Sequence, residues 1–208
     1  MKLVVLGATG GIGLEVVSQA LERGHSVTAF VRSAERLKSV AGKIALIEGD
    51  LLSSGELARV LEGQDAILSS FGAREPVTKA DSTLMRRFAA ALTTAMTQAR
   101  SRRVIVVSVA FLFKDSVIPP AYLVGRLLFP YTVADASAME DIFRQDGLDW
   151  TIVRPPELTD KPRTGKYRVR EGHLPRFGFK ISRADVADFM IRTAENRAWV
   201  GKIVGVCN

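Results

Sequence analysis

The sequence contains almost no residues that bind metals or form disulfide bonds. Cys207 is the only cysteine in the 208 residues, so neither an internal disulfide nor a cysteine-rich metal site can form. His25 and His173 are the only histidines, and no nearby cysteine or carboxylate gives them the spacing of metal ligands. We therefore expect no bound metal.

Long apolar runs are also missing. No stretch reaches the roughly eighteen apolar residues of a membrane-spanning helix, and the nearest is the broken run 121–131. After Met1 and Lys2 the chain enters a short apolar segment and then a glycine turn, without the apolar region and cleavage site of a secretory signal. These absences favour an unprocessed, cytoplasmic protein without a membrane partner.

Positive charge is in excess but is not concentrated. The formal net charge is +7, and the basic residues are scattered in ones and twos instead of lining one helix with aromatic residues between them. This distribution argues against a nucleic-acid-binding surface, and a small polyanionic ligand is the simpler partner. We expect a monomer or weak homo-oligomer that acts on a small molecule and binds no nucleic acid.

The residues that are present alternate between short apolar runs and segments of helical periodicity. The expected strands are 3–6, 26–31, 44–47, 66–68, 104–107 and 150–153. The expected helices between them are 12–21, 53–61, 83–99 and 134–144. This alternation predicts an α/β fold with a Rossmann-type, doubly wound parallel sheet and helices on both faces.

The C-terminal third has a different composition. Residues 155–181 are rich in proline, glycine and basic residues, and we expect them to form a small lobe that faces the substrate. Ser182 and Asp185 have the spacing of a capping box that opens a helix. Because no linker or internal repeat interrupts the pattern, 1–208 is predicted to be one domain.

A glycine turn follows the first expected strand directly. Gly7, Gly10 and Gly13 form a G-x-x-G-x-x-G pattern that ends a strand and opens a helix. A dinucleotide pyrophosphate needs backbone N–H groups and free space at such a point, and the hydroxyl of Thr9 can add a hydrogen bond. The alternative is that the glycines only permit a tight connection.

The end of the second expected strand indicates which dinucleotide is bound. Arg32 stands where NAD-specific sites carry an acidic residue, and Arg36 follows one helical turn later. Both guanidinium groups are predicted to face a 2′-phosphate, which selects NADPH; the alternative is a solvated basic helix start. Two charged hydrogen bonds of about 1.5–3 kcal/mol each give roughly a hundredfold preference after discounting for solvent exposure.

Other strand ends supply further candidates. Asp50 follows the third strand, where it can reach an adenine amino group or simply form a turn. The segment Ser70, Phe71 and Gly72 follows the fourth strand, where the glycine lets the backbone approach the adenosine ribose and phosphates. Arg74 is positioned to close over the same phosphates.

Taken together, these segments resemble the atypical short-chain dehydrogenase/reductase superfamily. The motifs GATGGIG, VRSAERL, EGDLLS, QDAILSSFGAR, SVAF and DWTIVRPPELTDKPRTGKY occur in the expected order and cover nearly the whole chain. Within the superfamily the sequence is most similar to the NADPH-dependent biliverdin reductase B and flavin reductase group.

The resemblance implies a set of cofactor contacts. Those to the pyrophosphate come from Thr9, Gly10, Gly11 and Ile12, those to the 2′-phosphate from Arg32 and Arg36, and those to the adenine from Asp50 and Leu51. It also implies that Ser108 lies beside the nicotinamide with Val109 and Ala110, and that Pro155, Pro156 and Glu157 flank the ring. The sequence departs from the group where histidines near the substrate are replaced by Ala136 and Glu157, and it carries extra residues around 122–131.

The acid–base pair of short-chain dehydrogenases, Tyr-x-x-x-Lys, is missing. Tyr131 is followed four residues later by Asp135, whose charge would raise the tyrosine pKa, and Tyr122 is followed by Arg126. Both tyrosines are expected to pack at the mouth of the substrate site. Ser108, at the end of the fifth strand, orients the acceptor or the nicotinamide, or else only ends the strand.

A conjugated acceptor does not need a positioned acid, because a flavin, quinone or tetrapyrrole accepts hydride into its π-system and takes its proton later from water. The apolar segments 111–113, 118–120 and 127–131 can clamp such a molecule, although they can equally form a satellite core or a partner surface. The sequence thus predicts an NADPH-dependent oxidoreductase with Ser108, Tyr131 and Glu157 as candidate catalytic residues. The alternative is a non-catalytic redox sensor similar to NmrA-like regulators, and a sugar-nucleotide epimerase ranks third.

Overall fold

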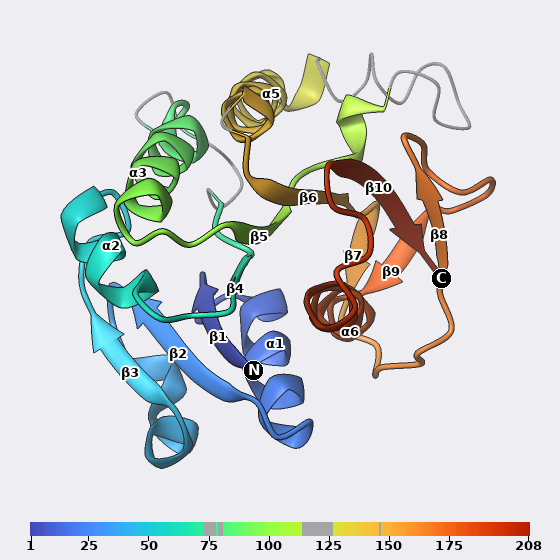
Figure 1. Ribbon diagram of the computed structural model, residues 1–208. Coiled ribbons are helices and arrows are strands. Elements are labelled where there is room, and N and C mark those ends of the chain that lie inside the picture. The colour runs from blue at the N-terminus through green and yellow to red at the C-terminus, as the bar shows by residue number, and fades with distance from the viewer. Residues whose placement is uncertain (73–77, 79–80, 114–126, 146) are drawn as a thin grey trace.

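The computed structural model describes residues 1–72, 78, 81–113, 127–145 and 147–208, which form a twisted sheet between two layers of helices (Figure 1). Eight strands lie in the order β3-β2-β1-β4-β5-β6-β10-β8. Their bounds are β3 (Ala45–Glu48), β2 (Ser26–Val31), β1 (Lys2–Leu6), β4 (Ala66–Ser69), β5 (Arg103–Val107), β6 (Asp149–Arg154), β10 (Lys202–Cys207) and β8 (Arg168–Glu171). All neighbouring pairs are parallel except β10 and β8.

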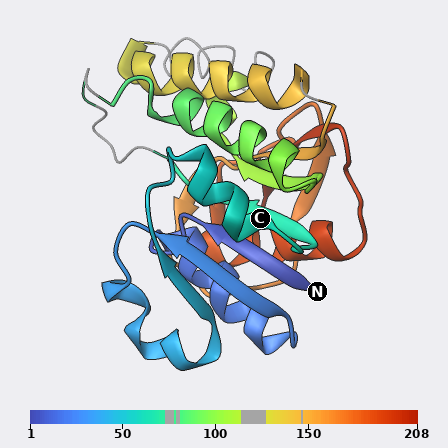
Figure 2. The same cartoon turned by 60° about the vertical axis from the view of Figure 1, so that its left-hand side comes forward.

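The central strands are apolar on both faces because each face is covered by helices. Leu3 and Val5 of β1 point into a core with α1 (Gly11–Glu22) and α6 (Arg183–Glu195). Val4 and Leu6 point into a second core with α2 (Ser54–Leu61), α3 (Leu84–Gln98) and α5 (Pro130–Gln145). Figure 2 shows the two helix layers from another side. The predicted doubly wound parallel sheet is confirmed.

Residues 155–181 contribute strands to both sheets. Strand β8 joins the edge of the main sheet beside β10, whereas β7 (Glu157–Thr159) and β9 (Lys180–Ser182) form a separate parallel pair. Figure 1 shows β7, β8 and β9 together with α6 on one side of the molecule. The described residues also form two 3-10 helices, η1 (Glu35–Lys43) and η2 (Ala110–Leu112).

The expected strands and helices lie within about one residue of their observed bounds, with one exception. The helix predicted over 134–144 begins at Pro130, so that the last apolar residues of 127–131 belong to its first turn and not to a loop. Proline fits the first helical position because its missing N–H would have no partner there. Strands β7, β8, β9 and β10 are not among the expected strands.

The predicted capping box at the start of α6 is half correct. Ser182 Oγ accepts a hydrogen bond from Asp185 N at 2.9 Å, as expected for a helix cap. The reciprocal bond is replaced, because Ser182 N donates to Asn208 Oδ1 at 3.0 Å. The Asp185 carboxylate instead accepts hydrogen bonds from Thr164, Gly165 and Asn208.

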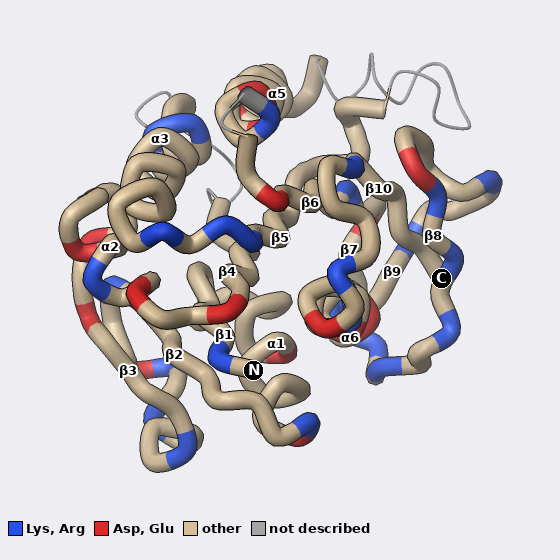
Figure 3. Tube along the Cα trace, viewed as in Figure 1, with Lys and Arg blue, Asp and Glu red and all other residues tan. Residues whose placement is uncertain are grey.

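Two further features concern the described residues as a whole. Lysine and arginine are dispersed over many elements and loops and do not line one helix (Figure 3). Within the described ranges of the chain, no helix is both long enough and apolar enough to cross a membrane.

Candidate functional site

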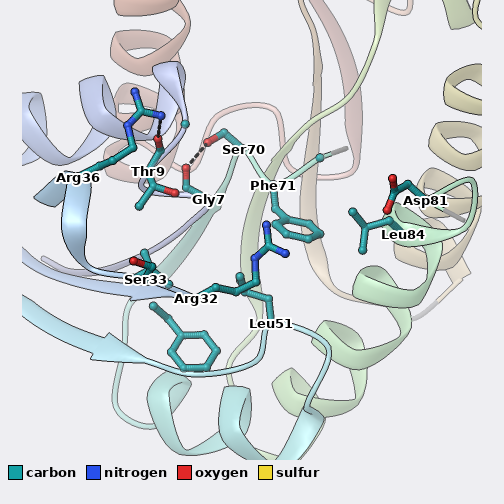
Figure 4. A pocket seen from close by; sticks show the side chains of 14 residues that line it. Gly7, Thr9, Arg32, Ser33, Arg36, Leu51, Ser70, Phe71, Asp81 and Leu84 are labelled. Atoms are coloured by element: carbon teal, nitrogen blue, oxygen red, sulfur yellow. Dashed lines mark hydrogen bonds between the residues drawn. The ribbon is translucent and has the colours of Figure 1, made fainter. Parts of the chain in front are cut away.

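A cavity of about 670 Å³ opens at the carboxyl ends of β1, β2 and β4. Nine of its lining residues are sequence-predicted site residues: Gly7, Thr9, Gly10, Arg32, Arg36, Leu51, Ser70, Phe71 and Gly72. Figure 4 shows that they come from the glycine turn, the end of β2 and the segments that follow β3 and β4. In a doubly wound sheet of this strand order, the point between β1 and β4 is where a dinucleotide crosses the strand ends.

Two glycines of the turn are required by backbone packing. Gly7 has a φ of +80°, and a Cβ there would lie 2.8 Å from the backbone nitrogen of Phe71. A Cβ on Gly13 would lie 2.1 Å from the carbonyl oxygen of Gly7. These two glycines therefore allow the turn, the start of α1 and the segment after β4 to pack closely, whatever is bound.

The N-terminus of α1 borders the cavity through Gly10. This residue is the helix N-cap and provides no side-chain cap, so the first N–H groups of α1 are available to an anion. Gly11 lies beneath the Arg183 side chain, whose Cδ would be 2.5 Å from a Cβ at that position. Ile12 is buried in the core beneath α1, so only its backbone can serve a phosphate.

The two arginines of the 2′-phosphate prediction line the same cavity but point in different directions. Arg36 Nη1 donates a hydrogen bond of 2.6 Å to the carbonyl oxygen of Thr9 and so lies against the glycine turn. Arg32 extends toward the Phe71 ring (Figure 4). Both are exposed side chains. The arrangement gives the cavity one cation beside the turn and another beside the aromatic wall.

The expected adenine contacts separate in the structure. Leu51 is buried and lines the cavity. Asp50 lies outside the cavity lining, and its carboxylate accepts a hydrogen bond from Leu52 N at 2.9 Å, as in the turn alternative. Ser70 Oγ donates to the carbonyl oxygen of Gly7 at 3.5 Å and links the two neighbouring strand ends. Arg74 lies outside the described residues.

Sequence reasoning missed five lining residues. Phe30, Val31 and Ser33 adjoin Arg32, so their position at the end of β2 carried the signal. Asp81 and Leu84 come from the start of α3 and carry no motif. Asp81 Oδ2 accepts a hydrogen bond from Thr78 Oγ1 at 2.8 Å. The cavity wall opposite β2 is therefore built by an element whose contribution only the fold reveals.

A second group of polar residues lies at the ends of β5 and β6. Ser108 is buried, and its Oγ donates to Glu140 Oε1 at 2.5 Å. Glu140 also accepts from Arg154 Nε at 2.9 Å and forms a bidentate ion pair with that guanidinium. Neither Glu140 nor Arg154 is a sequence-predicted site residue. Val109 is half-buried and Pro155 buried beside this group.

The other candidate catalytic residues lie apart from this group. Tyr131 is 46% exposed in the first turn of α5. Asp135 is turned away toward α3, where its carboxylate accepts hydrogen bonds from Met85 N and Arg86 N. The Glu157 side chain is 64% exposed and forms an ion pair of 3.2 Å with Lys180. Tyr122 and Arg126 lie outside the described residues.

Several proteins of known sequence or structure are similar to the chain. The Bacillus subtilis (strain 168) protein named "uncharacterized sugar epimerase YhfK" is 34% identical over 209 residues, covering 96% of this chain and 92% of the relative. "Uncharacterized protein YwnB" of the same organism is 28% identical over 181 residues, covering 81% of this chain and 78% of the relative.

Solved structures share the fold over the full length. A short-chain dehydrogenase/reductase from Veillonella parvula DSM 2008, in complex with NADP, has a TM-score of 0.84 at 19% identity and covers 100% of this chain and 94% of its own. The oxidoreductase ylbE from Lactococcus lactis has a TM-score of 0.80 at 22% identity, with coverages of 100% and 91%.

The sequence profile of the NAD(P)H-binding family matches residues 7–197, from the first glycine of the turn to two residues beyond the end of α6. This range includes the cavity at the ends of β1, β2 and β4 and the polar group at the ends of β5 and β6. The chain therefore belongs to the NAD(P)H-binding family of Rossmann-type proteins.

Proposed function

We propose that the protein is an NADPH-dependent oxidoreductase that reduces a flat conjugated acceptor such as a flavin, a quinone or a tetrapyrrole-like molecule. The observation that carries the cofactor assignment is the pair Arg32 and Arg36 in one cavity with the glycine turn. The last residue of β2 is followed by an arginine and not by the carboxylate that accepts a ribose 2′-OH. NADPH supplies the hydride, and the protein binds the cofactor and orients it toward the acceptor.

The proposed acceptor class rests on how the acidic and phenolic side chains near the strand ends are used. Asp135 caps α3, and Glu140 is held in an ion pair by Arg154. Tyr131 has no lysine four residues later, so the Tyr-x-x-x-Lys pair is missing here. A conjugated ring that takes its proton from water requires none of these groups, whereas a ketone requires a positioned proton donor.

Apolar side chains near the same strand ends support a flat, hydrophobic acceptor. The rings of Phe111 and Phe129 stack with centroids 5.6 Å apart, which joins the segment after β5 to the start of α5. Leu127 and Leu128 are 80% and 63% exposed beside them. An exposed apolar surface next to a cofactor crevice suits a planar ligand. The resemblance to the biliverdin reductase B and flavin reductase group supports the same class.

The direct test is turnover. Purified protein is mixed with NADPH and, separately, with FMN, riboflavin, a soluble quinone and biliverdin, and the absorbance of the reduced nicotinamide is followed. We expect net NADPH consumption with at least one of these acceptors and a lower rate with NADH. Tight NADPH binding without consumption by any of them would contradict the proposal and favour the non-catalytic redox sensor.

The name of the relative YhfK makes an epimerase the competing enzyme class. A sugar epimerase returns its cofactor to the starting state within each turnover, so it gives no net NADPH consumption. Incubation with a nucleotide sugar and oxidised cofactor, followed by analysis of the sugar stereochemistry, tests that class separately. We expect no epimerisation, because the Tyr-x-x-x-Lys pair that normally carries the proton is missing.

A further inference from the structure

Ser108, Glu140 and Arg154 join three elements beside the strand ends. Ser108 follows β5, Arg154 ends β6, and Glu140 comes from the middle of α5. The side chains of Glu140 and Arg154 are only 3% and 11% exposed. The Arg154 guanidinium also lies over the Phe113 ring, 4.7 Å from its centroid. A buried ion pair carries a large desolvation cost and is often replaceable by apolar residues without loss of stability, so stability alone does not account for it.

The hydrogen-bond directions in this group are fixed by chemistry. A guanidinium only donates, so both side-chain oxygens of Glu140 act as acceptors toward Arg154. The hydroxyl of Ser108 has a single proton, and at 2.5 Å that proton is committed to Glu140 Oε1. Toward any other partner, Ser108 Oγ offers only lone pairs. It can therefore accept a hydrogen bond from a ligand but cannot donate one to a ligand carbonyl.

Ser108 lies outside the lining of the cofactor cavity but at the same edge of the sheet. Strands β4 and β5 are neighbours, with Ser69 opposite Val106, and the segment that follows Ser69 lines the cofactor cavity. Ser108 follows β5 at the same edge of the sheet. A dinucleotide whose adenosine half lies over β2 directs its nicotinamide half across β4 toward β5 and β6.

We propose that Glu140 and Arg154 are positioning residues that fix Ser108 as a hydrogen-bond acceptor at the nicotinamide end of the site. The ligand group it recognises is an N–H or O–H donor, carried either by the carboxamide of the nicotinamide or by the acceptor, as in the imide N–H of a flavin. This inference rests on the proposed function, deepens it, and excludes Ser108 as a proton donor to the acceptor.

The cofactor arm of the test uses binding, so it does not depend on turnover. The dissociation constants of NADPH and of its reduced 3-acetylpyridine analogue, whose methyl ketone has no N–H, are compared by calorimetry in the wild type and in Ser108→Ala. If the carboxamide is the donor, the wild type binds the analogue about three- to tenfold more weakly, and Ser108→Ala binds both alike. The control is Ser101→Ala, the same change at a buried serine before β5. It should keep the wild-type ratio of the two dissociation constants.

The acceptor arm compares the KM for riboflavin with that for its N3-methyl derivative. If the donor lies on the acceptor, methylation raises KM in the wild type and not in Ser108→Ala. The double variant Glu140→Leu/Arg154→Met replaces the ion pair with apolar side chains of similar volume. The Ser108 hydroxyl then loses its acceptor and is free to donate. We expect this double variant to lose the wild type's preference for NADPH over the analogue, or for riboflavin over its N3-methyl derivative. A discrimination ratio unchanged by Ser108→Ala in both arms would overturn the inference even if turnover and NADPH binding are normal.

Discussion

At the residue scale, three glycines of one motif have different neighbours. Gly7 and Gly13 face backbone atoms, whereas Gly11 faces the end of the Arg183 side chain, which is itself paired with Asp160 at 2.6 Å. Backbone atoms in a packed turn cannot move away from an added Cβ, whereas a long side chain can change rotamer. The motif in the sequence does not reveal this difference, because Arg183 lies far away along the chain.

Alanine substitutions should therefore separate these positions. Gly13→Ala is expected to lower the free energy of unfolding by about 1–3 kcal/mol or more, because the new Cβ would lie 2.1 Å from Gly7 O. Gly11→Ala is expected to change it by less than about 1 kcal/mol, since Arg183 can move and alanine favours a helix. Urea denaturation of both variants measures the difference. Equal destabilisation would contradict this assignment of the two glycines.

Arg32 and Arg36 should also differ, because only Arg36 is bonded to the glycine turn. Arg32→Ala is expected to weaken NADPH binding about tenfold and to leave NADH binding unchanged, since it removes a partner of the 2′-phosphate alone. Arg36→Ala is expected to weaken both, because the turn that holds the pyrophosphate loses its contact at Thr9. Calorimetric titration of each variant with both cofactors is the measurement. Equal affinity of the wild type for NADPH and NADH would refute the 2′-phosphate assignment.

At the scale of elements, the site is formed where secondary structures from distant segments meet. Helix α3 contributes Leu84 to the cofactor cavity, and its first N–H groups are satisfied by Asp135 from α5. A carboxylate at a helix N-terminus satisfies donors that have no partner within the helix and interacts favourably with the helix dipole. Helix α5 thus supports the cavity wall, because its Asp135 caps the N-terminus of α3.

Asp135→Ala should show this support. We expect a loss of about 1–3 kcal/mol in the free energy of unfolding, because the N–H groups of Met85 and Arg86 lose a buried charged acceptor. Urea denaturation gives the value. The control is Asp141→Ala in the same helix, an exposed residue whose carboxylate pairs with Arg144 at 3.4 Å, and this change should alter stability by less than about 0.5 kcal/mol. Similar losses for both variants would show that the cap is not the cause.

At the scale of the whole molecule, Asp185 connects three parts of the chain. Its buried carboxylate joins the start of α6 to Thr164, Gly165 and Asn208. Burial by itself raises the pKa of this carboxyl, but the hydrogen bonds from Asn208, Gly165 and Thr164 outweigh burial and hold the pKa below its usual value. The charged form is therefore favoured in the folded protein.

The sign of the pH dependence follows from this lowered pKa. The unfolded chain binds a proton at Asp185 at a higher pH than the folded protein, so the contribution is fully present above about pH 5 and is lost as the pH falls below about 4. Asp185→Asn is expected to be about 1–3 kcal/mol less stable at pH 7, with a smaller difference at pH 3. Urea denaturation from pH 7 to pH 3 measures the difference in the free energy of unfolding between the wild type and the variant. The contributions of the other carboxylates are common to both proteins and cancel in this difference. A difference that grows toward pH 3 would contradict the prediction.

The sequence by itself determined the alternation of strands and helices, the glycine turn and the cations that follow β2. These depend on interactions between residues close in the chain, such as helical periodicity, caps and strand ends. Only the tertiary structure decided that helix α5 begins at Pro130, that β10 inserts beside β6, and that Asp135 caps α3. It also brought Glu140 and Arg154 to Ser108, 32 and 46 positions away along the chain. The pairing of buried polar groups is set by which elements pack together, and local sequence does not encode that information.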